Sequence, residues 1–132
     1  MKAVLMSIKP EYGYKILHGE KTVELRKTVP RDLEFMHGKG GRLVYLYFTG
    51  TGMVLGCFYL DYDVEVGPLG DLKRLAKAAA LSMAELIAYG TGRDGAYHGW
   101  KVKEPGTFVT PIPLSAFGLK RPPQSWCYVE AL

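Results

Sequence analysis

Residues 19–26 read Gly-Glu-Lys-Thr-Val-Glu-Leu-Arg, and the fold can be worked out from this stretch in both directions. From residue 22 onward, polar and apolar residues alternate. This period of two predicts a half-buried strand, because successive side chains of a strand point to opposite faces. One face carries Val23 and Leu25, with Lys21 at its entry. The other face is polar and ionised and carries Thr22, Glu24 and Arg26.

The residues before this strand predict a buried strand followed by a short helix. Residues 3–8 form an apolar run that is typical of a buried strand. Pro10 can begin a helix because its missing N–H would be unpaired in the first turn anyway. Gly19 is a natural helix stop. We therefore expect a helix over residues 10–18, with an apolar side made of Tyr12, Ile16 and Leu17.

The residues after it predict more strands. Residues 43–49 and 53–63 are rich in β-branched and aromatic side chains, and Thr-Gly-Thr-Gly at 49–52 separates them. This pattern is typical of a hairpin. Three further short strands are expected at Trp100–Lys103, Phe108–Ile112 and Trp126–Glu130. The prolines near them confine these strands to edges or strand ends.

Two more helices are expected in the middle of the chain. Asp71 can cap a helix that carries apolar residues at helical spacing, namely Leu72, Leu75, Ala76 and Ala79. Ser82 and Glu85 form the Ser-x-x-Glu capping box of the next helix. With about six short strands, two or three helices and no regular βαβ alternation, the inventory predicts an α+β fold whose sheet closes into a small barrel.

Composition narrows the class of protein. The 132 residues fit a single domain over residues 1–132, and 48% hydrophobic with 23% charged residues argue against a disordered chain. The apolar runs are too short to span a bilayer. Cys57 and Cys127 provide neither a disulfide framework nor zinc-ligand spacing. We expect a reduced, cytoplasmic protein that uses no metal and no cofactor and does not bind a membrane.

The net charge of +4 is unevenly spread. Residues 1–42 carry nine Lys/Arg and five Asp/Glu, residues 43–72 carry four acids and no base, and residues 73–132 carry eight bases and four acids. If the two basic ends fold onto one face, they form a patch suited to a polyanion such as nucleic acid. A solvated surface of mixed charge explains the same numbers.

Two motifs resemble a known family. Gly19, Lys21, Glu24 and Arg26 match the Gly-x-Lys-x-x-Glu-x-Arg motif that follows a strand and a Lys-Pro helix start in ASCH domains, which belong to the PUA-like superfamily. The stretch Pro-Pro-Gln-Ser-Trp at residues 122–126 resembles the end of many bacterial members. The resemblance implies a small PUA-like β-barrel of about six strands flanked by helices, with a cleft at the motif strand.

The family resemblance further implies RNA binding. The expected ligand is a short single-stranded RNA or a nucleoside-like group held in a basic cleft, and the RNA-binding candidates at the motifs are Lys9, Lys21, Glu24, Arg26, Gln124 and Ser125. Tyr97 and Trp100 lie outside the family motifs and are RNA-binding candidates for their aromatic rings alone. The residues themselves fit this role. Arg26 can fork onto a phosphate, Lys21 can act as a point charge, and Glu24 can orient Arg26 or accept a hydrogen bond from a base. A purely structural Glu–Arg pair is the alternative.

Aromatic residues suggest a stacking surface. Tyr97 and Trp100 flank His98 after a glycine-rich loop, and exposed aromatic rings can stack on unpaired bases. Packing in the core or at the barrel rim is the competing interpretation of both rings.

An enzyme acting on RNA or on a modified nucleoside is the alternative function. The candidate catalytic residues are Lys21, Glu24, His98 and Ser125. A metal-independent ribonuclease fits them. An acetylcytidine amidohydrolase matches at Lys21 only: its threonine position is Glu24 here, its glutamate falls in Ala78–Ala80, and Thr22 lies on the face opposite Lys21. A module that binds a protein partner is a third class, and the sequence does not specify the oligomeric state.

Overall fold

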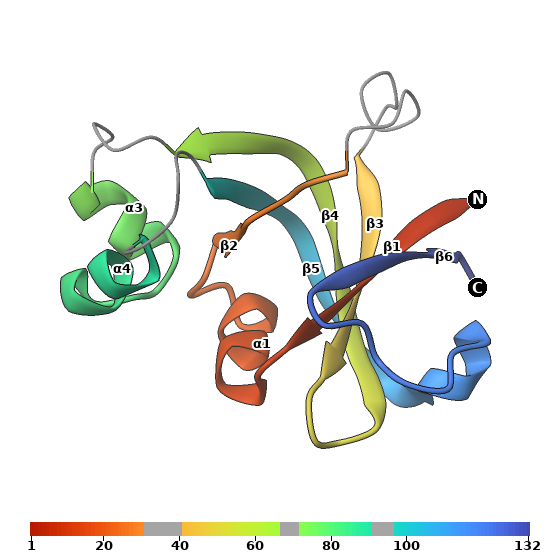
Figure 1. Ribbon diagram of the computed structural model, residues 1–132. Helices are drawn as coiled ribbons and strands as arrows, with labels where there is room; N and C mark the ends of the chain where they lie inside the picture. Colours follow the sequence, from red (N-terminus) through yellow and green to blue (C-terminus); the bar gives the residue numbers. More distant parts are fainter. Residues whose placement is uncertain (31–40, 67–71, 91–96) are drawn as a thin grey trace.

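Six strands form one curved sheet in the order β2-β5-β4-β3-β1-β6 (Figure 1). The computed structural model describes residues 1–30, 41–66, 72–90 and 97–132. The strands are β1 (Lys2–Ile8), β2 (Val23–Arg26), β3 (Arg42–Phe48), β4 (Met53–Val66), β5 (Tyr97–Pro113) and β6 (Trp126–Glu130). The helices are α1 (Pro10–Leu17), α3 (Leu72–Ala78), α4 (Met83–Gly90) and the 3-10 turn η1 (Leu114–Phe117). The predicted α+β class is confirmed, with six strands forming a half-barrel flanked by helices.

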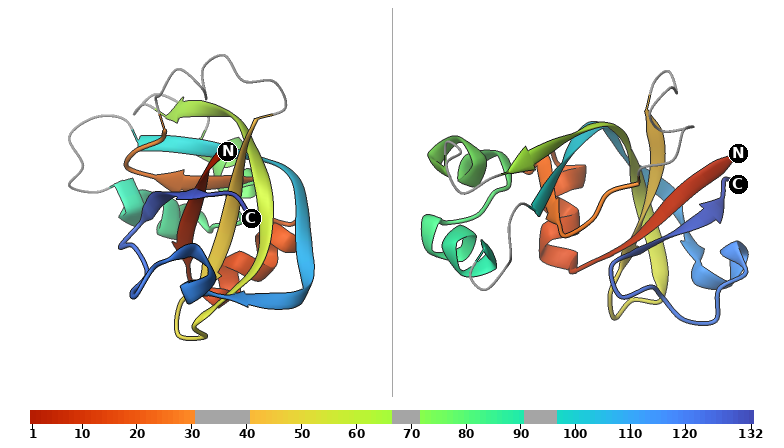
Figure 2. Two further views of the ribbon diagram at one scale, coloured as in Figure 1. Left: turned by 90° about the vertical axis from the view of Figure 1, so that its right-hand side faces the viewer. Right: turned by 45° about the horizontal axis from the view of Figure 1, so that its top comes forward.

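All neighbouring strands are antiparallel except β1 and β3, which lie parallel to each other. Helices α3 and α4 lie at one end of the molecule, and both chain termini lie at the other (Figures 1 and 2). The half-barrel has two edge strands, β2 and β6, which do not pair with each other. The open side between these edges is where the predicted motif strand lies.

The prediction for residues 97–113 was wrong in one respect. The two expected short strands are parts of one long strand, β5, which pairs with β4 through several register shifts. Between the two parts, Glu104 has a positive φ of 50° and Pro105 follows it. This irregularity bends the strand and lets it follow the curve of the barrel. Only residues 98–101 pair with β2, so the prolines of β5 lie where its second edge is free.

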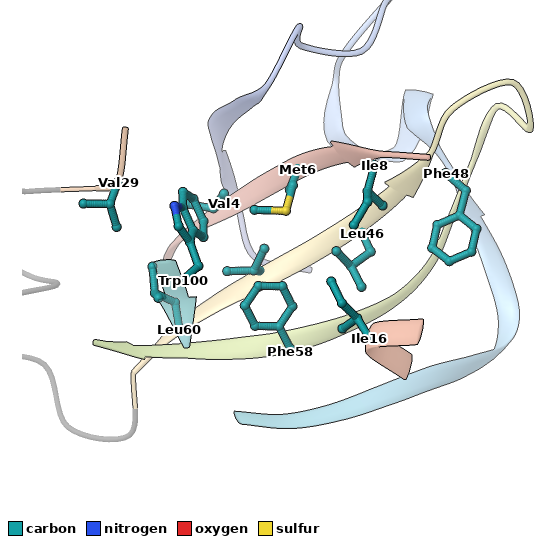
Figure 3. Close-up of a cluster of buried hydrophobic side chains, with 11 residues drawn as sticks. Val4, Met6, Ile8, Ile16, Val29, Leu46, Phe48, Phe58, Leu60 and Trp100 are labelled. Atoms are coloured by element: carbon teal, nitrogen blue, oxygen red, sulfur yellow. The ribbon is translucent and has the colours of Figure 1, made fainter. Parts of the chain in front are cut away.

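The central strands are buried on both faces. From β1, Val4, Met6 and Ile8 pack into one hydrophobic cluster together with Phe58 and Trp100 (Figure 3). Alternate residues of β1 and β3 pack into a second cluster on the opposite face, against residues of the η1 region. The near-continuous apolar run of β1 therefore reflects a strand with no solvent-facing side.

Helix α1 packs closely on the sheet at Gly13. A Cβ atom added there would overlap the ring of Phe48, so the helix axis approaches the sheet as nearly as the backbone allows. Ile16 is fully buried in the first cluster, and Tyr12 and Leu17 pack against it, as predicted. Gly19, two residues after the end of α1, has a φ of +83°, a backbone conformation that residues with a Cβ rarely adopt.

The helical pair α3–α4 covers the apolar face of β2. Val23 and Leu25 pack with Ala76, Ala79 and Leu86 in a third cluster. The predicted capping box is present: the Ser82 hydroxyl accepts from the Glu85 N–H at 3.0 Å, and the Glu85 carboxylate accepts from the Ser82 N–H at 2.9 Å. The predicted cap Asp71 and the glycine-rich loop at 92–95 lie outside the described residues.

Candidate functional site

A cavity of about 1000 Å³ lies on the open side of the half-barrel. Its walls come from the end of β1, from α1, from β2, from α4 and from the residues just before β6. Six of the eight predicted RNA-binding residues line it: Lys9, Lys21, Glu24, Arg26, Gln124 and Ser125. The two sequence motifs, almost a hundred residues apart at Arg26 and Ser125, meet in this cavity.

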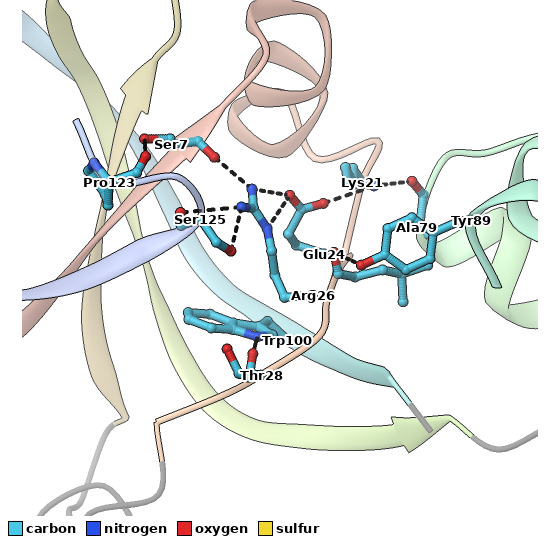
Figure 4. A network of polar contacts seen from close by, with 11 residues as sticks. Ser7, Lys21, Glu24, Arg26, Thr28, Ala79, Tyr89, Trp100, Pro123 and Ser125 are labelled. Atoms are coloured by element: carbon cyan, nitrogen blue, oxygen red, sulfur yellow. Dashed lines mark hydrogen bonds and ion pairs between the residues drawn. The ribbon is translucent and has the colours of Figure 1, made fainter. Parts of the chain in front are cut away.

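Arg26 lies at the centre of a network of polar contacts among residues that line the cavity, and we call this network the cavity floor (Figure 4). Its Nε and Nη2 atoms donate to Glu24 Oε2 at 3.2 and 2.8 Å. Nη2 also donates to the Ser7 carbonyl at 2.8 Å, and Nη1 donates to the carbonyl and hydroxyl oxygens of Ser125 at 3.3 and 3.1 Å. These five hydrogen bonds account for all five N–H groups of a guanidinium. Arg26 is therefore held as a clamp within the protein.

The clamp joins the two edges of the sheet. Arg26 belongs to β2, whereas Ser125 directly precedes β6 and Ser7 lies in β1. A second bridge lies nearby, where Trp126 Nε1 donates to Thr28 Oγ1 at 2.9 Å. Side chains thus connect the edges that backbone pairing leaves apart. The structural interpretation of the Glu–Arg pair accounts for this geometry, while a direct contact from Arg26 to phosphate would require one of its five bonds to break.

Lys21 is buried in the cavity wall, with 2% of its surface exposed. Its ammonium donates to the Ala79 carbonyl and lies 3.3 Å from Glu24 Oε1. It also lies 5.4 Å from the centre of the Tyr12 ring. Burial lowers the pKa of Lys21, and the Glu24 carboxylate opposes part of that shift. Ala79 O and Glu24 receive two of its three N–H groups, so the ammonium has donor capacity left for a ligand.

The predicted facing of Lys21 was wrong. A regular strand from residue 21 would place Lys21 and Glu24 on opposite faces, but β2 begins only at Val23. Lys21 lies in the turn before it, where its N–H and that of Glu20 both donate to the Lys15 carbonyl at the end of α1. The turn rotates the lysine side chain toward Glu24. Thr22 Oγ1 points to the Ala78 carbonyl, at 3.4 Å.

Helix α4 forms the opposite wall of the cavity. Tyr89 lines it and donates from its hydroxyl to the Leu25 carbonyl at 3.0 Å. Glu85 lines it too, and accepts from the Tyr12 hydroxyl of α1 at 3.4 Å. Burial, followed by the charges of Glu11 and Glu85, raises the pKa of Tyr12. The hydrogen bond from the Ser82 N–H is the main reason that the pKa of Glu85 is lowered.

Trp100 and His98 do not line this cavity. Trp100 is fully buried in the core, and its indole N–H donates to the Thr28 carbonyl at 2.9 Å, so the prediction of an exposed stacking platform was wrong for this residue. As the cross-strand partner of Glu24 it lies on the same face of the sheet, where its ring packs against that of Trp126. His98 pairs with Arg26 across the strands, is half-buried and is not among the residues that line the cavity. The side chain of Tyr97 lies outside the described residues.

Sequence reasoning missed the aromatic lining of the cavity. Tyr12 and Tyr89 take the place that Trp100 was predicted to fill, and Lys27 adds a second exposed lysine to the lining alongside Lys9. Tyr12 was assigned to the apolar side of α1, where its ring does pack, but its hydroxyl faces Glu85. Only the adjacency of α1 and α4 in three dimensions reveals this, because no pattern within either helix signals it.

Other reactive groups lie elsewhere. Burial raises the pKa of both thiols, Cys57 and Cys127, which belong to the second hydrophobic cluster and do not line the cavity. Within the described ranges, no three His, Cys, Asp or Glu side chains are grouped so that they could hold a metal ion. None of the helices in the described part of the chain is long and apolar enough to cross a membrane.

The chain is similar to solved structures of one protein, the ASCH protein of Zymomonas mobilis. Its crystal structure has a TM-score of 0.75 at 24% identity, covering 97% of this chain and 87% of that one. A serine-to-alanine mutant of it gives 0.78 at 23% identity, with 97% and 88% covered. A tyrosine-to-phenylalanine mutant gives 0.76 at 24% identity, with 98% and 91% covered. No protein-family model and no curated protein matches this sequence.

Proposed function

We propose that this chain, which has the PUA-like fold of the ASCH structures, is an RNA-binding domain that holds one unpaired nucleotide of a single strand in the cavity. The observation that carries the proposal is the composition of that cavity. Exposed lysines, two tyrosine rings and a buried ionic floor surround one space of about 1000 Å³, the upper end of the usual size for a small-ligand site.

The lysines supply the affinity for phosphate. Lys9 and Lys27 are exposed at the cavity, and neither forms an ion pair with a carboxylate among the described residues. An ammonium on a flexible stem suits a phosphate whose position varies from ligand to ligand. Arg26 does not take this role, because Glu24, Ser7 and Ser125 already engage its N–H groups.

The tyrosine rings and the polar floor suit a base. Tyr12 and Tyr89 are half-buried and line the cavity, so each offers an aromatic surface to a base that has left its stack. The remaining N–H of Lys21, the hydroxyl of Ser125 and the exposed amide of Gln124 are available to hydrogen-bond its edge. Donors outnumber acceptors in this set, which favours a base edge rich in carbonyl oxygens.

The test is binding of fluorescein-labelled single-stranded RNA decamers, measured by anisotropy at two salt concentrations. The wild-type affinity should fall with added salt, and K9A/K27A should weaken it about tenfold or more and flatten the salt dependence, because two phosphate contacts are lost. K73A/K77A, which removes the same charge from the exposed side of α3, is the matched control. Binding that ignores salt would contradict the proposal and favour an apolar protein partner.

A second function, cleavage of RNA without a metal, is favoured by one observation. Lys21 is a buried lysine with a lowered pKa that lies beside a carboxylate in a cavity, and such groups are typical of sites that transfer protons. Lys21 and Glu24 would then take the acid–base roles, with Ser125 close to them through Arg26.

Incubation of labelled RNA separates the two functions. Under binding alone, the RNA is retained and stays intact. Under catalysis, products form, and they disappear with E24Q while retention of the RNA persists. His98 is tested by H98A in the same assay, and loss of product there would extend the site beyond the cavity lining.

A further inference from the structure

A basic segment leads from the cavity across the surface of the molecule. It comprises residues 119–125, Leu-Lys-Arg-Pro-Pro-Gln-Ser, and it connects η1 to β6 (Figure 1). Gln124 and Ser125 at its far end line the cavity. Lys120 and Arg121 lie within five residues of Ser125, so they are at most about 18 Å from it along the chain.

The segment is fastened at both ends. Gly118, with φ of +74°, ends η1, and Leu119 packs against the second hydrophobic cluster. At the other end, the Ser7 hydroxyl donates to the Pro123 carbonyl at 2.7 Å, and the Ser7 N–H donates to the Ser125 carbonyl at 2.9 Å. The described contacts therefore anchor the segment to β1 and to the core.

Its middle is stiff and carries only positive charge. Pro122 and Pro123 fix their own φ angles, and a residue before proline is restricted to extended conformations. Lys120, Arg121 and Gln124 are exposed along this segment, whose backbone bends on either side of the two prolines, at residues 120–121 and 124–125. The sequence has no acidic residue between Glu104 and Glu130, so no near neighbour in the chain offsets the two cations.

We propose that residues 120–124 are a phosphate track on which a single strand of RNA continues after its nucleotide enters the cavity. The inference rests on the proposed function and names its ligand more closely: a polynucleotide rather than a free nucleotide or nucleoside. Lys120 and Arg121 bind backbone phosphates outside the cavity, and Gln124 lies at the boundary between track and cavity. Because the two prolines restrict the backbone, little conformational entropy should be lost when both cations bind phosphate.

The experiment compares a labelled nucleoside 5′-monophosphate with a labelled single-stranded decamer of the same base, using the full chain. Wild type should bind the decamer at least tenfold more tightly than the monophosphate. K120A/R121A should weaken decamer binding about tenfold and lower the magnitude of its salt slope by about 1.4, since two single-strand phosphate contacts are lost. The affinity for the monophosphate should remain within about twofold.

The same charge change on α3, K73A/K77A, should alter decamer affinity less than about twofold, because those lysines lie on the helical pair and do not line the cavity. A K120A/R121A effect no larger than this control would overturn the track while leaving the cavity function in place. The track would also be overturned if poly-L-glutamate displaced the labelled decamer as readily as unlabelled decamer does, because binding would then require only a polyanion. Failure of wild type to bind either RNA ligand would overturn the proposed function and the track together.

Discussion

At the scale of single residues, the site depends on a series of polar side chains, each of which contacts the next. Lys21 contacts Glu24, Glu24 contacts Arg26, and Arg26 contacts Ser125. The outer ends of this series have donor capacity left, and its centre does not. If the proposed ligand enters the cavity, we therefore expect Lys21 and Ser125 to contact it while Arg26 holds the floor together.

Replacing Arg26 tests the clamp. Arg26→Ala removes the guanidinium from Glu24, whose side chain is only 10% exposed, and should lower the free energy of unfolding by about 3–5 kcal/mol. Arg26→Lys keeps the charge but cannot fork to three groups, so its loss should be intermediate. Urea unfolding followed by tryptophan fluorescence measures both. Arg121→Ala, at an exposed position, should stay within about 0.5 kcal/mol of wild type; an equal loss there would refute the clamp.

Lys21 gives a pH dependence with a defined sign. Its pKa in the folded protein is lowered from 10.5 by burial, so the unfolded chain holds more protons between the lowered pKa and 10.5. The free energy of unfolding should therefore rise with pH across that window. Lys21→Met removes this contribution. We expect the stability of wild type relative to Lys21→Met to increase from neutral pH toward pH 10 in urea titrations, whereas a decrease would show that the Glu24 contact outweighs burial.

The motif residues were predictable because their spacing is a local property. Lys21, Glu24 and Arg26 are within six residues of one another, and alternation in the strand places Glu24 and Arg26 on one face. Trp100 was not predictable in the same way. Its aromatic character suits both a core and a surface, and only the pairing of β5 with β2 decides between them.

At the scale of elements, helices and hairpins followed their sequence signals closely, whereas β5 did not. Capping residues and glycines mark the ends of α1 and α4, because these signals act on the nearest turn. In β5, two short strands were expected, separated at residues 104–107, which include Pro105 and Gly106. Backbone pairing with β4 continues on both sides of this irregularity, so the two parts form one strand. Because that pairing is between residues far apart in the sequence, no local pattern predicts it.

The approach of α1 to the sheet is open to a direct test at Gly13. Gly13→Ala improves helix propensity by about 1 kcal/mol, but the new methyl group overlaps Phe48. Overpacking should win, with a net loss of about 1–3 kcal/mol in the free energy of unfolding, measured by urea denaturation. Gly106→Ala is the control, because a Cβ there meets nothing within 4 Å. A stabilised Gly13→Ala protein would mean that α1 sits farther from the sheet.

At the scale of the whole molecule, the curved sheet stays open between β2 and β6, and the cavity occupies that opening. The sequence predicted a barrel with a cleft at the motif strand. The sheet is curved as in a barrel, and the cavity lies at the motif strand. The sequence did not predict how the two edges of the open sheet are held together. Arg26 and the Trp126–Thr28 bond bridge the edges, and both connect residues about a hundred positions apart.

A ligand in the opening should stabilise both edges together. If RNA contacts Lys9 and Lys27 on one side and Gln124 on the other, amide hydrogen exchange should slow in β2 and β6 alike when the decamer is added. Exchange measured by mass spectrometry on peptides covering each strand checks this. Protection limited to one edge would mean that the ligand does not span the cavity.

The pairing of β1 with β6 has a consequence for how the site comes into being during synthesis. The motif strand leaves the ribosome early, but the groups that complete its floor belong to residues 123–126. Until these emerge, Arg26 lacks its Ser125 partners and the exposed edge of β1 has no neighbour. A chain that stops short of residue 123 therefore carries the motif without the groups that hold Arg26 in place, and we expect the site to form only once the C-terminal strand has paired with β1.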